Sequence, residues 1–227
     1  MERKSFSDFF YQSVEIFKNN FKSISPVLLI LVLIDIYGML TISDQSDAHN
    51  IISTLTSALF EVVLTVYLIN LYLSKLTVIP FSLNKCFWDI PTYLFYELAF
   101  GVCFLVGVVI FVIPGIFVYF FFSMVPTVAI AFDHYESENE GIFSLTKRSV
   151  TSNKSTYLLI LILGLVLSAV NWGSEKIFLI SDHNFIIGIG FSLMNSLLIC
   201  IYTGVIVSFL ANTVRENSQI ETGLLSE

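Results

Sequence analysis

Stretches of apolar residues alternate with short polar segments along the whole chain, and six of these stretches are long enough to cross a membrane. A transmembrane helix needs about 20 mostly apolar residues. The stretch 93–132 is about twice that length, and the dipeptide Pro114-Gly115 near its middle is a turn signal, so we predict a helical hairpin there. The predicted spans are residues 26–42, 52–73, 93–113, 115–132, 157–172 and 185–211.

The segment before the first span has a different pattern. Apolar residues recur every three or four positions, with polar residues between them, at Phe6, Phe10, Val14, Phe17 and Phe21. This spacing predicts an amphipathic helix that lies in the membrane interface, with its aromatic rings toward the acyl chains.

Two later polar segments contain nearly the same phrase, FSLNK at 81–85 and FSLTK at 143–147, each shortly before another apolar stretch. The repetition indicates three units, each an amphipathic helix followed by two spans, in which the serine of the phrase caps the helix. A chance match between membrane loops of similar composition explains the phrase equally well. The predicted fold is therefore an all-α polytopic membrane protein with six transmembrane helices, interfacial amphipathic helices and a three-fold repeat as its simplest organisation.

The composition favours a membrane protein and excludes some functions. The chain is 56% hydrophobic and 13% charged, whereas about a quarter of the residues in a soluble domain are charged. The net charge of −7 argues against a nucleic-acid partner. Cys86, Cys103 and Cys200 have neither paired nor CxxC spacing, so we expect no disulfide and no zinc site, and nothing predicts a cofactor.

The distribution of lysine and arginine predicts the orientation. Cytoplasmic loops of membrane proteins are enriched in these residues. Ten of the eleven fall on one side of an even-numbered topology, and only Lys176 falls on the other. Residues 1–25 are then a cytoplasmic amphipathic segment, 26–211 the membrane domain and 212–227 a cytoplasmic tail. The segments 43–51 and 173–184 are predicted to be outward loops.

The region 93–170 carries a recognisable arrangement of motifs. An apolar hairpin turns at Pro114-Gly115, FSMVP follows at 122–126, GIFSLTKRS at 141–149, and Ser152-Asn153 comes next. This arrangement resembles the YciC family of uncharacterised bacterial inner-membrane proteins, and it is similar to the membrane domain attached to some glycerophosphoryl diester phosphodiesterases. The resemblance implies a six-span protein of a bacterial inner membrane with no assigned chemistry. The phosphodiesterase activity does not carry over, because the chain has no soluble catalytic domain.

The fourth predicted span contains a proline. Pro126 removes a backbone hydrogen bond and is predicted to kink the helix, and the hydroxyl groups of Ser123 and Thr127 lie close enough in sequence to reach the freed carbonyl.

Three carboxylic acids within predicted spans are the candidate functional groups. Asp35 and Glu61 lie near the middle of the first and second spans, and Glu97 lies nearer the cytoplasmic end of the third. Ionisable residues inside a membrane mark functional sites, so Asp35 and Glu61 could form a proton-coupled pair. Hydrogen bonding between helices is the favoured interpretation, because polar side chains also hold membrane helices together.

The sixth predicted span carries small residues at every fourth position. This ridge consists of Gly188, Ser192, Ser196, Cys200, Gly204 and Ser208. Ridges of small residues allow helices to approach closely, and packing within the bundle is favoured over a dimer interface.

Walker A, HExxH and GxSxG motifs are not found in the sequence, so no catalytic residue is assigned. We expect a non-enzymatic protein that acts in envelope maintenance or as a membrane partner. Its partners would be membrane lipids and either a second copy or another membrane protein. A small proton-coupled or lipid-handling transporter and an accessory subunit of a lipid-modifying enzyme are the alternatives.

Overall fold

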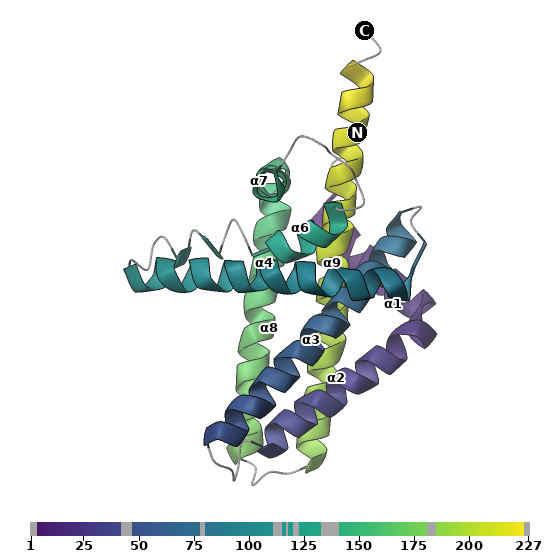
Figure 1. Ribbon diagram of the computed structural model, residues 1–227. Helices are drawn as coiled ribbons and strands as arrows, with labels where there is room; N and C mark the ends of the chain where they lie inside the picture. The colour runs from purple at the N-terminus through teal and green to yellow at the C-terminus, as the bar shows by residue number, and fades with distance from the viewer. Residues whose placement is uncertain are drawn as a thin grey trace.

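The computed structural model describes residues 4–41, 47–77, 80–110, 115–116, 118–119, 123–132, 141–180 and 185–224. Within these residues every regular element is a helix (Figure 1). The helices are α1 (Phe6–Asn19), α2 (Phe21–Thr41), α3 (Asp47–Leu76), α4 (Leu83–Ile110), α6 (Val125–Phe132), α7 (Ile142–Ser152), α8 (Lys154–Ile180) and α9 (Phe185–Leu224). The prediction of an all-α polytopic membrane protein is confirmed in its general form.

The N-terminal amphipathic helix turns sharply into the first apolar helix. The axes of α1 and α2 differ by 95° across Asn20. The backbone N–H and the side-chain amide of Asn20 both donate to the carbonyl of Ile16, at 3.0 and 2.9 Å, and close the last turn of α1. At the other end of α1, the backbone N–H and the hydroxyl of Ser5 donate to the carboxylate of Asp8 at 2.7 and 2.8 Å. The cap of α1 is therefore Ser5.

The α7–α8 pair repeats this arrangement. The two axes differ by 103° across Asn153. The side-chain oxygen of Asn153 accepts a hydrogen bond of 3.3 Å from the N–H of Thr156 at the start of α8. Its amide group donates to the carbonyl of Lys4 at 3.2 Å, which ties this corner to the residues before α1. Two of the three predicted units thus consist of an amphipathic helix, a corner at an asparagine and an apolar helix.

The middle unit differs from the prediction, because α4 runs through Pro91 without a corner. The phrase FSLNK begins just before α4, whereas FSLTK begins inside α7, so the phrase does not mark the same position in both units. Ser82 precedes the first residue of α4, but the residue before α7 is Gly141 and Ser144 lies within the helix. The prediction rested on the similarity of the two phrases. The first residue of each helix depends instead on where the backbone leaves the extended conformation, and this position differs between α4 and α7.

The hairpin of α4 and α6 lies crosswise to α8 and α9 (Figure 1). Gly115 allows the two arms to approach, because a Cβ atom there would meet the side chain and backbone of Val108. Within the predicted span 115–132, the described helix α6 has eight residues and is about 12 Å long, too short to cross a membrane by itself. Pro126 is the second residue of α6, where a missing N–H leaves no intrahelical bond unmade, so the predicted mid-span kink is instead a helix start after a turn at 123–124.

Several predicted boundaries are also extended in the structure. The fifth span was predicted to end at residue 172, but α8 continues to Ile180. The ammonium group of Lys176 lies 5.9 Å from the ring centroid of Trp172, one turn earlier, and this packing is compatible with a continuous helix. The predicted outward loop 43–51 is shortened because α3 begins at Asp47, and the predicted tail continues α9 to Leu224.

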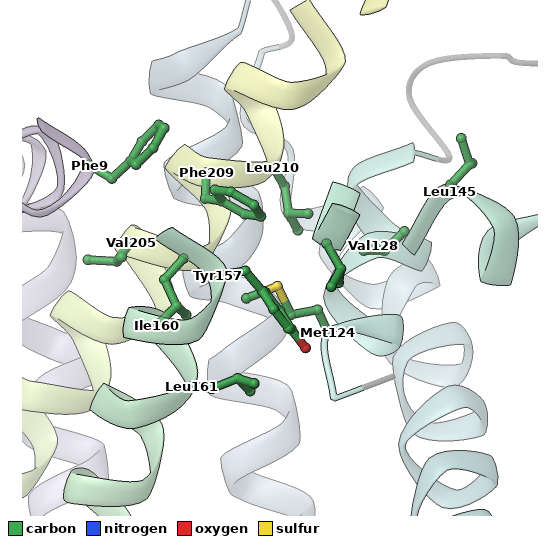
Figure 2. Packing of buried hydrophobic residues seen from close by; sticks show 11 residues of the cluster. Phe9, Met124, Val128, Leu145, Tyr157, Ile160, Leu161, Val205, Phe209 and Leu210 are labelled. Atoms are coloured by element: carbon green, nitrogen blue, oxygen red, sulfur yellow. The ribbon is translucent and has the colours of Figure 1, made fainter. Parts of the chain in front are cut away.

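Helix α9 is the centre of the fold, since it contacts α1, α2, α3, α6, α7 and α8. The buried apolar residues form three clusters, and α9 contributes to each of them. Figure 2 shows the cluster that joins α9 to α1, α6, α7 and α8, in which the rings of Phe9 and Phe209 meet edge to face at 5.8 Å. The labelled side chains are Phe9, Met124, Val128, Leu145, Tyr157, Ile160, Leu161, Val205, Phe209 and Leu210.

Three helical segments of the described chain are long and apolar enough to cross a membrane by themselves, namely Ala58–Leu76, Leu83–Ile110 and Ile186–Thr213. The number rises to five if each cornered pair, α1–α2 and α7–α8, counts as one span. α1 and α7 are amphipathic and turn away from the apolar helices that follow, and their location in the membrane interface stays a prediction.

Candidate functional site

The three candidate carboxylic acids lie on three different helices. Asp35 lies on α2 and Glu61 on α3, two helices that pack together, but the side chain of Asp35 is outside the described residues. The side chain of Glu61 is exposed. Glu97 lies on α4, where its carboxyl group accepts a hydrogen bond from the phenol of Tyr93, one turn earlier. The proposed pairing of Asp35 with Glu61 stays a prediction.

The small-residue ridge of α9 lies inside the bundle. All six of its members are buried. Gly204 faces α1 and α3, where a Cβ atom would lie less than 3.0 Å from the hydroxyl of Ser13 and from the ring of Tyr72. The hydroxyl of Ser13 itself donates a hydrogen bond of 2.8 Å to the carbonyl of Ile201 on α9. At Gly204 the ridge is therefore the surface on which α1 and α3 close against α9.

Two hydroxyl groups of this ridge are buried without a hydrogen bond. The Oγ atoms of Ser196 and Ser208 contact no solvent and have no hydrogen-bond partner among the described residues. Ser192, by contrast, donates a hydrogen bond of 3.1 Å to the carbonyl of Val32 on α2. At Ser196 and Ser208 the small size of serine, rather than its hydroxyl, explains the fit.

A buried polar pair that sequence reasoning missed joins α3 to the base of the α4–α6 hairpin. The amide group of Asn70 donates a hydrogen bond of 2.8 Å to the carboxylate of Asp89 and one of 3.1 Å to the carbonyl of Val66. Both Asn70 and Asp89 are 5% exposed. Burying a carboxylate costs free energy unless hydrogen-bond donors reach it. The contact between Asn70 and Asp89 therefore holds the first turns of α4 against α3.

The sequence did contain a signal for this pair. Asn70 interrupts an otherwise apolar part of α3, and Asp89 lies three residues after Cys86, so Cys86 and Asp89 share one face of α4. Both are buried, whereas Leu83 and Phe87, on another face of α4, are each 68% exposed.

A pocket of about 130 Å³ lies where the hairpin meets α7. One face of α4 lines it with Tyr96, Ala99, Phe100 and Cys103, residues spaced three or four apart. The remaining wall comes from Val118, from Val125 of α6 and from Phe143 of α7, and the ring of Phe143 lies 6.5 Å from that of Tyr96.

The chemistry of this pocket is almost entirely apolar. Ala99 and Cys103 leave space because they are small, while the rings of Phe100 and Phe104 lie near Tyr119 and close the hairpin side. Such a pocket can hold a hydrocarbon segment. Sequence reasoning did not find it, because its walls come from three separate segments of the chain.

No family model matches the chain, and searches of curated proteins and of solved structures returned no match either.

Proposed function

We propose that the protein is a non-enzymatic multi-pass protein of a bacterial inner membrane that acts in envelope maintenance as a partner of other membrane components. In this proposal both termini face the cytoplasm. This orientation requires the hairpin to return the chain to the side from which α4 starts, so that α2, α3, α8 and α9 supply an even number of crossings.

The observation that supports a partner function is the exposure of α4. None of its most apolar window of 18 residues is buried, whereas 50% and 56% of the corresponding windows of α3 and α9 are. Its outward residues follow a helical spacing and include Phe95, Leu98, Val102, Leu105 and Val109, which are 60–82% exposed. Helices in a membrane associate in part through close side-chain packing, and this surface offers apolar side chains for such packing against another protein.

The test is photocrosslinking in intact cells. A photoreactive phenylalanine analogue at Leu105 should give one discrete protein adduct. The same analogue at Leu158, which is 47% exposed on α8, should give none. An adduct of twice the chain mass would identify a second copy as the partner. The adduct should disappear when Val102, on the same face of α4, is replaced by lysine. Lipid adducts alone at both positions would contradict the proposal.

Lipid handling is a second candidate function, and the apolar pocket between α4, α6 and α7 favours it. The pocket lies on the opposite face of α4 from Leu105, so the two functions can be tested independently.

A further inference from the structure

We infer that the pocket between α4, α6 and α7 holds part of one acyl chain of an anionic phospholipid whose headgroup binds the lysines at the α7–α8 corner. This inference deepens the second candidate function and does not depend on the partner proposal.

The size and the walls of the pocket fit a hydrocarbon chain. A single water molecule needs about 10–15 Å³ of such space, so 130 Å³ has room for a segment several carbons long. The aromatic walls, Tyr96, Phe100 and Phe143, offer no polar arrangement that would orient a polar ligand. Phospholipids are the apolar molecules present in excess around any protein whose helices cross a membrane.

The position of Phe143 connects the pocket to the membrane surface. Phe143 lines the pocket from the first turn of α7, and Lys147 lies one turn later on the same side of this amphipathic helix. Lys147 is exposed. A chain that enters the pocket beside Phe143 therefore has its headgroup at the level of the Lys147 ammonium group, where lysines reach phosphates.

Further positive charge lies at the α7–α8 corner, which follows Lys147 in the chain. Lys154 begins α8 and is exposed, and the hydrogen bond from Asn153 to the carbonyl of Lys4 brings a third lysine to this place. The acidic residue next to Lys4 in α1 is Asp8, whose carboxylate is held by Ser5. The acidic residues of the segment 133–140 are outside the described residues. Among the described residues, these three lysines and the one carboxylate favour an anionic headgroup over a zwitterionic one.

The headgroup must supply the selectivity. An acyl chain in the pocket exchanges one apolar environment for another, so it gains only packing contacts. A lysine near an anionic surface contributes about a fivefold preference for anionic lipid. Loss of Lys147 should therefore reduce the preference without closing the pocket.

The experiment uses the full-length protein in nanodiscs that contain phosphatidylcholine and a photoreactive phosphatidylglycerol with a diazirine in its acyl chain. Labelled residues are mapped by mass spectrometry. We expect labelling of Tyr96, Cys103 and Phe143 to exceed labelling of the outward residues Leu98 and Leu105. Replacing the lipid with photoreactive phosphatidylcholine should lower pocket labelling about fivefold or more, since at least one lysine contributes to the preference.

Matched variants test the pocket and the headgroup site separately. Ala99→Trp should fill the pocket and reduce its labelling several-fold, whereas Leu105→Trp, on the outward face of the same helix, should leave pocket labelling unchanged. Lys147→Gln should bring phosphatidylglycerol labelling about fivefold closer to that of phosphatidylcholine. Because a tryptophan in the pocket could impair folding, Cys103→Phe provides a milder filling variant.

Two results would overturn the inference. Equal labelling of the inward and outward faces of α4, unchanged by either filling variant, would mean that no chain occupies the pocket. Pocket labelling that is equal for the two lipids and insensitive to Lys147→Gln would mean that the headgroup assignment is wrong. Neither result bears on the protein adduct at Leu105, so the partner proposal would stand or fall separately.

Discussion

Replacing Gly204 with alanine is the most direct test of how closely α1, α3 and α9 pack. A Cβ atom at this position would lie less than 3.0 Å from Ser13 Oγ and from ring atoms of Tyr72. The Tyr72 side chain is fully buried and cannot move into solvent. Closer approach than 3.0 Å forces a shift of the neighbouring groups, so the helices must separate or Ser13 must turn away from Ile201.

The change in the free energy of unfolding follows from two unfavourable terms and one favourable term. Overpacking a well-packed core costs about 1–3 kcal/mol. Loss of the hydrogen bond from Ser13 to Ile201 adds about 1 kcal/mol. Alanine in place of glycine gains about 1 kcal/mol from its higher helix propensity. We therefore expect Gly204→Ala to lower the free energy of unfolding by about 1–3 kcal/mol, and Gly204→Leu to lower it further.

Gly190 provides the matched control on the same helix, because nothing lies within 4 Å of the position of its Cβ atom. Only the propensity term acts there, so Gly190→Ala should be neutral or stabilise by up to about 1 kcal/mol. Unfolding can be followed in mixed micelles by circular dichroism as a denaturing detergent replaces a mild one. If Gly204→Ala is as stable as Gly190→Ala, α9 is not packed against α1 and α3 as described.

A second variant locates the cause. Removing the hydroxyl in Ser13→Ala relieves one of the close contacts at Gly204, so the double variant Ser13→Ala/Gly204→Ala should be more stable than the sum of the two single effects. Strict additivity would show that the Ser13 hydroxyl does not limit the approach of α1.

Four further predictions follow from the described contacts. Ser208→Ala removes a buried hydroxyl without a hydrogen bond and should stabilise the fold by about 1 kcal/mol in the same unfolding assay, and a clear loss of stability would mean that the hydroxyl has a partner. Asn70→Ala removes the 2.8 Å donor to the buried Asp89 carboxylate and should cost about 1–3 kcal/mol, whereas Asn84→Ala, in the exposed first turn of α4, should cost little, and equal effects would contradict the role of the pair. The hydrogen bonds from the Ser5 backbone and side chain lower the pKa of Asp8 below its ordinary value of 3.8, so its support for α1 is present above that ordinary value and is lost as the pH falls through the lowered pKa. Amide exchange in α1 should accordingly be faster in Asp8→Asn than in the wild type near pH 6, and the difference should vanish in acid. Gly115→Val would place a side chain against Val108 and should force the hairpin arms apart, which spin labels on α4 and α6 would report as a longer distance, whereas Gly101→Ala, with open space around it, should leave that distance unchanged.

The sequence by itself determined the helical elements and the membrane class, because both depend on local patterns. The run of apolar residues in α9 predicts a long helix whatever surrounds it, and the 3.6-residue period of α1 predicts an amphipathic one. The small-residue ridge could be recognised for the same reason. The fifth span was predicted to end at residue 172, just before the charged residues Glu175 and Lys176, but α8 continues through both, since charged residues can end an apolar stretch without breaking a helix.

Only the tertiary structure decided how the helices meet. The burial of Asp89 depends on the hydrogen bond from Asn70, nineteen positions earlier. The pattern of residues within either helix cannot predict a contact between the two helices. The pocket depends on α4 turning its small residues Ala99 and Cys103 toward Phe143 on α7. The crosswise direction of the hairpin depends on the same contacts, because an apolar helix gains nearly as much from lipid as from protein and its own sequence does not fix its direction.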